Sequence, residues 1–297
     1  MNVIVYDGQY SITFDEVKKN ASKYQASNSN TVRTERNTWT DWFLLPSTRP
    51  VVTTPTVKTS SIEIPGANGL LDTTEALTGY PTYGNSSGSF EFILDIDRSA
   101  KSWIEVYNEL KGYFHGRELK MILTDEPDYY YIGRFKVNQW KSDKEKNLIT
   151  IDYETEPYRR SIMSSIGDWL WDSFNFRTGV IYERKFAGLT INSASAWTTA
   201  YKFDMKTIGN MPVVPRFNID LTDNPDPTAM TMGVKVWNKF RQDAPVEGVL
   251  KATDTTTRKG STLDPRLIFM TPDEYDIVEV RFQGVGTVDI EFIPGRL

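Results

Sequence analysis

Two aspartates, Asp95 and Asp97, stand two residues apart and are the sequence's best candidates for a pair of catalytic carboxylates. In a β-strand this spacing places both side chains on one face. Paired carboxylates can act as acid and base on a glycosidic bond, or bind calcium. The same pattern is typical of the solvent-facing side of a strand that ends in a helix cap, and we favour that interpretation. A hydrolase acting on glycans or cell walls is therefore the weakest of three functional hypotheses.

Other catalytic and cofactor chemistry has little support in the sequence. The chain has no cysteine and one histidine, His115, which rules out thiolate zinc sites, cysteine nucleophiles and two-histidine metal sites. His115 follows a predicted helix, where a cation favours the helix dipole. No Gly-x-Gly-x-x-Gly or Walker-type pattern follows a predicted strand. We predict no enzyme, no cofactor and no metal.

Tryptophans raise a second hypothesis, a glycan-binding virion or surface adhesin module. Trp169, Trp171, Trp197 and Trp237 are numerous enough to form an aromatic platform for sugars. Tryptophan also fills cores because of its large area, and core packing is the interpretation that we favour.

Length and charge limit the class of protein. A chain of 297 residues with 39% apolar and 25% charged residues indicates a globular protein of two domains. The net charge of −5 argues against a broad nucleic-acid-binding surface. We interpret the basic groups as solvated faces or a hairpin tip; they are Lys141, Lys144, Lys146, Arg159 and Arg160. No signal peptide or membrane-spanning apolar run is visible, so membrane insertion is not expected.

One amphipathic helix is predicted over 99–114, with a cap at Asp97 or Ser99. Its apolar face repeats at helical spacing. The residues of that face are Trp103, Val106, Tyr107, Leu110 and Phe114.

The rest of the N-terminal half favours an antiparallel sheet. Strands are expected at 3–6, 119–123, 129–137 and 148–153, and a polar loop at 15–40. Prolines at 46, 50 and 55 remove ladder donors, which predicts an edge or extended arm over 46–58. Such a segment pairs readily with neighbouring chains.

The C-terminal half favours a β-sandwich after a junction at 157–168. Strands are expected at 180–186, 197–205, 213–221, 230–237 and 277–282, followed by a turn at Gly284-Val285-Gly286 and a last strand at 287–293.

Six short segments occur in an order that resembles one protein family. They are Tyr6-Asp7-Gly8, 44–52 (LLPSTRPVV), 64–69 (IPGANG), 75–84 (EALTGYPTYG), 155–158 (TEPY) and 284–297, which begins GVGTV and ends PGRL. This order resembles the distal tail proteins (Dit) of long-tailed phages that infect Gram-positive hosts.

The resemblance implies a mainly β protein (all-β or α+β). An N-terminal split-barrel-like antiparallel domain with one helix (1–160) would form a six-fold ring, and a C-terminal galectin-like β-sandwich (166–297) would lie outside it. The homo-hexamer would join the tail tube protein to the tail-tip or lysin-type protein and to receptor-binding proteins. The tape-measure protein and DNA would pass through it without specific DNA binding. The virion tail tip would be its location, after synthesis in the host cytoplasm.

The resemblance also suggests which residues contact a neighbouring subunit. They are Leu45, Arg49, Val52, Tyr80 and Tyr83. The galectin sugar-site pattern is missing, since the C-terminal half has no histidine.

Overall fold

The computed structural model describes residues 10–17, 35–76, 78–138, 148–166, 174–175, 180–181, 186–205, 208–237, 244–269 and 277–297. The chain divides into two compact units, Met1–Arg159 and Arg160–Leu297. Both are built from antiparallel strands, and the described residues contain one α-helix. The protein is therefore mainly β, as predicted.

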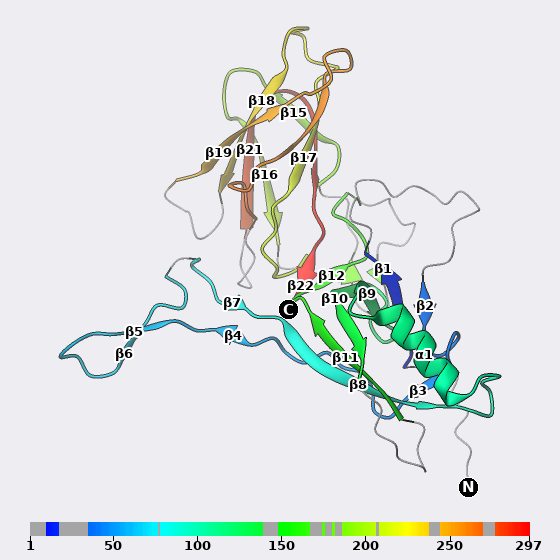
Figure 1. Cartoon of the computed structure of the whole chain (residues 1–297). Helices are drawn as coiled ribbons and strands as arrows, with labels where there is room; N and C mark the ends of the chain where they lie inside the picture. Colours follow the sequence, from blue (N-terminus) through cyan, green and yellow to red (C-terminus); the bar gives the residue numbers. More distant parts are fainter. Residues whose placement is uncertain are drawn as a thin grey trace. The chain divides into compact units, whose positions relative to one another are not determined.

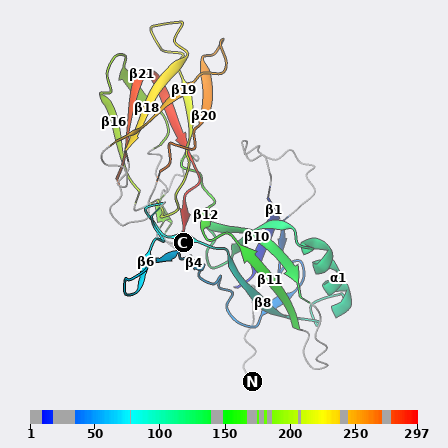
Figure 2. The same cartoon turned by 60° about the vertical axis from the view of Figure 1, so that its left-hand side comes forward.

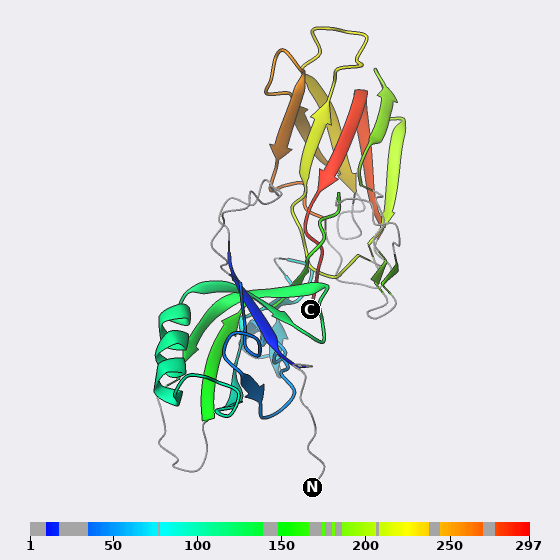
Figure 3. The same ribbon diagram turned by 90° about the vertical axis from the view of Figure 1, so that its right-hand side faces the viewer.

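The first unit is a curled antiparallel sheet with the strand order β2-β1-β9-β10-β11-β8-β3 (Figure 3). Its strands are β1 (Ile12–Glu16), β2 (Arg36–Asn37), β3 (Leu44–Pro46), β8 (Ser86–Leu94), β9 (Glu118–Leu123), β10 (Tyr129–Val137) and β11 (Leu148–Thr155). The predicted strands at 119–123, 129–137 and 148–153 are confirmed as β9, β10 and β11. The segment predicted as an edge or extended arm, 46–58, begins at the end of edge strand β3 and has no strand from 47 to 56, so it is not a central strand.

The prediction of a loop from residue 15 to 40 is wrong at both ends. β1 pairs with β9 from Ile12 to Glu16, and its residues Ile12 and Phe14 are fully buried. Two alternating apolar residues are too short a pattern to predict a strand. The predicted strand at 3–6 and the polar tip at 142–147 lie outside the described residues.

The helix α1 (Trp103–Phe114) buries Val106, Leu110 and Phe114, as its periodicity predicted. It begins later than predicted, and its cap is Ser102 rather than Asp97 or Ser99. The Ser102 backbone N–H and hydroxyl both donate to the Glu105 carboxylate, at 2.7 Å each. The bond from the Ser102 backbone N–H to the Glu105 carboxylate is one of the two hydrogen bonds of a capping box. It gives a partner to a backbone donor at the start of the helix.

Aromatic rings join α1 to the sheet. The Phe14 ring lies 4.8 Å from the Phe114 ring and 5.0 Å from the Phe135 ring, with edge-to-face geometry in both pairs. Such contacts stabilise beyond the area that they bury. The core of the first unit therefore lies between α1 and the inner face of its sheet.

The second unit has two layers of strands around one core (Figure 2). Its main strands are β15 (Leu189–Ser193), β16 (Thr199–Asp204), β17 (Arg216–Asp220), β18 (Thr231–Trp237), β19 (Val246–Lys251), β20 (Lys259–Leu263) and β21 (Ile277–Glu291). β16, β17 and β18 confirm three predicted strands. The arrangement agrees with the predicted β-sandwich.

The predicted turn at Gly284-Val285-Gly286 is wrong, because β21 is one strand of 15 residues. Residues 277–283 pair with β16 and β18, and residues 284–291 pair with β15 and β17. Gly284 and Gly286 have φ angles of 149° and 150°, which favour glycine. The two glycines therefore let one strand pass between the two layers without reversing its direction.

The described residues also contain shorter strands. They are β4 (Val57–Lys58), β5 (Ser61–Glu63), β6 (Leu70–Asp72), β7 (Thr82–Tyr83), β12 (Arg159–Ser161), β13 (Phe174–Asn175), β14 (Val180–Ile181) and β22 (Gly295–Arg296). β13 pairs with β14, and β12 pairs with β22.

Candidate interaction surface

Residues 56–84 of the first unit form an extended arm that projects from the sheet (Figure 1). At its base β4 pairs with β7, and further out β5 pairs with β6. Gly66 and Gly69 have φ angles of 85° and 84° in the turn that joins β5 to β6. These left-handed conformations explain the two glycines in the segment IPGANG.

The arm exposes an unusual number of large apolar side chains. They are between 45 and 65% exposed, and they are Val57, Ile62, Ile64, Leu70 and Leu71. Every residue of β4, β5 and β6 is exposed. A two-stranded ribbon has no second layer under which to bury such residues. Ile62 is opposite Leu71, and Leu70 is opposite Glu63, so apolar side chains lie on both faces of the ribbon. Large exposed apolar side chains gathered in one segment are typical of a site of protein association.

The outer part of the arm is also acidic. Glu63, Asp72 and Glu75 are its charged residues between 59 and 84, a stretch without Lys, Arg or His. Hydrogen bonds from Thr74 lower the pKa of the Asp72 carboxyl. The Thr73 backbone N–H donates to the Ser60 carbonyl at 2.9 Å and extends the ribbon beyond β5 and β6. The arm therefore combines apolar and acidic side chains.

The predicted contact residue Tyr83 lies at the base of the arm, against its own chain. Its ring packs edge-to-face on Tyr158, with 6.0 Å between the ring centres. Burial raises the pKa of Tyr158 to about 12. Tyr80 lies nearby in sequence and is half-buried. The two tyrosines thus belong to the root of the arm rather than to its exposed part.

The other predicted contact residues lie along the edge of the sheet. Leu45 of β3 is paired with Ile93 of β8. Arg49 donates from Nε to Asp125 at 2.7 Å, and Val52 packs against the core. The structure therefore divides the predicted set between an edge segment and the root of the arm. Ile62, Ile64, Leu70 and Leu71 are exposed apolar residues that we did not single out from the sequence, where their signal was apolar residues on both sides of a glycine turn.

The candidate carboxylates Asp95 and Asp97 do not share a strand face, because β8 ends at Leu94. Asp95 Oδ2 lies 3.5 Å from Arg98 Nε, and its Oδ1 accepts the Arg98 backbone N–H. The prediction that both carboxylates lie on one face of a strand is wrong, and so is the favoured interpretation as the solvent-facing side of a strand that ends in a helix cap. Their segment is the connection between β8 and α1.

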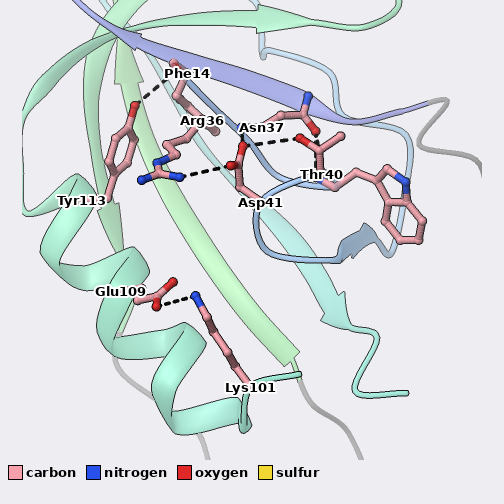
Figure 4. A network of polar contacts seen from close by, with 9 residues as sticks. Phe14, Arg36, Asn37, Thr40, Asp41, Lys101, Glu109 and Tyr113 are labelled. Carbon is pink, nitrogen blue, oxygen red and sulfur yellow. Dashed lines mark hydrogen bonds and ion pairs between the residues drawn. The ribbon is translucent and has the colours of Figure 1, made fainter. Parts of the chain in front are cut away.

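Figure 4 shows another polar network in the first unit, and its groups hold backbone in place. The Asp41 carboxylate accepts the Arg36 guanidinium at 3.1 Å and the Asn37 backbone N–H at 2.8 Å. The Tyr113 hydroxyl donates to the Phe14 carbonyl at 3.2 Å, and burial raises its pKa to about 12. These contacts join the segment around β2 and the end of α1 to the sheet.

Within the described ranges, no group of three or more His, Asp or Glu side chains is arranged to hold a metal ion. No helix there is long and apolar enough to cross a membrane.

Trp197 and Trp237 are half-buried and do not belong to the buried core, so the favoured prediction of core packing is wrong for these two tryptophans. Lys235 Nζ lies 4.5 Å from the centre of the Trp197 ring, and the Arg281 guanidinium lies 4.8 Å from that of Trp237. Each ring thus has a cation on one face, a favourable contact that competes with sugar stacking. Trp169 and Trp171 lie outside the described residues.

No family model matches the chain, and no curated protein matches its sequence. Among solved structures, the chain is similar to the SPP1 Dit (gp 19.1) protein, reported as a paradigm of the hub adsorption apparatus in phages infecting Gram-positive hosts. The two chains are 12% identical, the match covers 88% of this chain and 96% of that chain, and the TM-score is 0.48.

Proposed function

We propose that this protein is the distal tail, or hub, protein of a long-tailed phage. Six copies would form a ring that joins the tail tube to the baseplate or tip. The ordered set of six sequence segments supports this family. The observation that carries the proposal is the arm, since its exposed apolar surface has no cover within the described part of its own chain.

A closed ring needs a heterologous interface, in which one surface of each copy contacts a different surface of the next. The arm supplies one such surface, with apolar side chains and short strands that can pair further. We propose that it packs on the neighbouring copy, and that Leu45, Arg49, Val52, Tyr80 and Tyr83 border the contact. The first unit would be the split-barrel-like ring domain, and the second a galectin-like domain outside it.

The proposal includes partners and a location. The ring would contact the tail tube protein on one side and a tail-tip or lysin-type protein on the other, and receptor-binding proteins would attach outside. Its opening would pass the tape-measure protein and DNA. The protein would act without catalysis at the tail tip of the virion, after synthesis in the host cytoplasm. The engagement of Asp95 with Arg98 and of Asp41 with Arg36 agrees with a structural role.

The test is the mass of the full chain in solution, measured by light scattering and accompanied by negative-stain images. We expect rings of six copies with an open centre. Ile62 and Leu71 are paired across the ribbon and are 55 and 51% exposed. The double change Ile62→Asp and Leu71→Asp should break the rings into smaller species, because two new charges would have to be buried.

A matched control is Val249→Asp, which changes an equally exposed apolar residue of the second unit (53% exposed). It should leave the rings intact. The melting temperature of all three proteins should agree, since the changed positions lie outside both cores. Unchanged rings in the double variant would contradict the role of the arm. A wild-type protein that stays monomeric alone and with tail tube protein would contradict the hub proposal.

A further inference from the structure

A polar groove lies on the outer face of the second unit, over β17, β20 and the second half of β21. Its volume is about 490 Å³, and it is largely open to solvent. The side chains that matter for its chemistry are Asn218, Asp220, Lys259, Ser261, Thr287 and Asp289, and the loop 253–257 forms one wall.

The strand register brings these side chains together. Asn218 of β17 is opposite Ser261 of β20 and Asp289 of β21. Asp220 is opposite Lys259 and Thr287 in the same way. The alternate residues Phe217 and Ile219 are buried in the core. Alternation along three neighbouring strands thus presents six polar groups on one surface.

Several of these groups have unused hydrogen-bonding capacity among the described residues. The hydroxyls of Ser261 and Thr287 make no hydrogen bond there. Asn218 donates from its amide to Glu291 Oε2 at 3.1 Å, which leaves its side-chain oxygen without a donor. Asp289 accepts the Gly188 backbone N–H at 2.7 Å with one oxygen and has the second oxygen available.

The charged and polar groups of the groove disfavour three classes of ligand, namely anions, metal ions and apolar molecules. Lys259 Nζ lies 2.8 Å from Asp220 Oδ2, so each neutralises the other. Asp254 and Asp289 then leave an excess of negative charge, which disfavours anions. The ammonium of Lys259 beside the carboxylate disfavours a metal ion. An apolar ligand would remove water from the polar side chains of the groove without replacing their hydrogen bonds, which is unfavourable.

We propose that the polar groove binds a neutral glycan through its hydroxyl groups. The side-chain oxygens of Asn218 and Asp289 would accept hydrogen bonds from sugar hydroxyls, and Ser261 and Thr287 would donate to them. This site differs from the tryptophan platform considered from the sequence. It does not depend on ring formation, so light scattering and glycan binding test the two proposals separately.

Saturation-transfer NMR on the full chain tests the groove, with a panel of glucose, galactose, their N-acetylamino derivatives and short oligomers of each. We expect transfer to at least one of them at about 10 mM or below, a typical range for few hydrogen bonds in an open groove. The double change Ser261→Ala and Thr287→Val should weaken that binding about tenfold, through loss of two donors.

The control is Thr231→Val, the same chemical change at an exposed threonine of β18 outside the groove. It should bind like the wild type. If the double variant melts below the wild type, Ser261→Ala alone replaces it, because Ser261 is exposed. Absence of transfer to the whole panel would overturn the proposal. Binding that is equal in wild type and groove variants would also overturn it.

Discussion

Arg159 is a residue whose environment we predicted wrongly from the sequence. With Arg160 it formed a basic pair that we predicted to be solvated. In the structure the Arg159 guanidinium pairs with the Glu126 carboxylate, and the two side chains are only 27 and 33% exposed. It also lies 5.0 Å from the centre of the Tyr129 ring. The prediction of a solvated Arg159 is wrong, because no local pattern reveals a partner 33 residues away.

The partial burial of the Arg159–Glu126 ion pair predicts that loss of the cation lowers the free energy of unfolding. Arg159→Met keeps the aliphatic stem but leaves Glu126 without its cation, and we expect it to lower the free energy of unfolding by about 1–2 kcal/mol. Lys136→Met is the control, since Lys136 is 71% exposed and lies 3.8 Å from Asp152. It should change stability by less than about 0.5 kcal/mol. Urea unfolding of both variants is the measurement, and equal effects would contradict the assigned role of Arg159.

At the scale of elements, hydrophobic alternation predicted some strands and failed for others. β11 and β18 alternate buried and less buried residues, and their positions were predicted. β20 is Lys-Gly-Ser-Thr-Leu, and none of its residues is buried, so it has no apolar signal. Its pairing with β17 depends on backbone hydrogen bonds to a distant segment. The sequence did not predict the polar groove, because β20 is one of its strands and neither β20 nor its pairing with β17 could be predicted.

β21 yields a prediction about the element as a whole. A Cβ at position 286 would lie 2.5 Å from the Asp220 carbonyl oxygen, and the φ of 150° is rare for other residues. Gly286→Ala should therefore lower the free energy of unfolding by at least about 2 kcal/mol. Thermal unfolding followed by circular dichroism is the measurement.

The matched control for β21 is Gly112→Ala in α1. A Cβ there meets open space, and alanine raises helix propensity by up to about 1 kcal/mol. The two glycine-to-alanine changes should thus have opposite signs. A Gly286→Ala protein as stable as the wild type would contradict the explanation of how β21 passes between its two layers.

At the scale of the whole molecule, each unit has a core of its own. One cluster of buried residues belongs to the first unit and the other to the second. The sequence analysis placed a junction at 157–168, and the resemblance implied that the C-terminal domain starts at 166. In the structure, Ser165 is buried and its contacts lie at the far end of the chain. No sequence pattern shows such a contact over 125 residues or more.

These contacts predict where an autonomous C-terminal fragment must begin. The Ser165 hydroxyl donates to the Ile290 carbonyl at 2.8 Å and accepts the Phe292 backbone N–H at 2.8 Å, and the Ser165 N–H donates to the Phe292 carbonyl. A fragment of residues 160–297 keeps all three hydrogen bonds, whereas 166–297 loses them and leaves buried groups unpaired. We expect the longer fragment to be more stable by about 2–4 kcal/mol. Urea unfolding of both fragments measures the difference.

Ser165→Ala in the longer fragment separates the contribution of the Ser165 hydroxyl to stability from that of the Ser165 backbone. It removes the two hydroxyl contacts but keeps the backbone hydrogen bond from Ser165 to Phe292. Its stability should therefore lie between those of the two fragments. If 166–297 unfolds at the same urea concentration as 160–297, the segment before residue 166 is only a connector. If it unfolds earlier by the expected margin, the segment is part of the fold of the second unit.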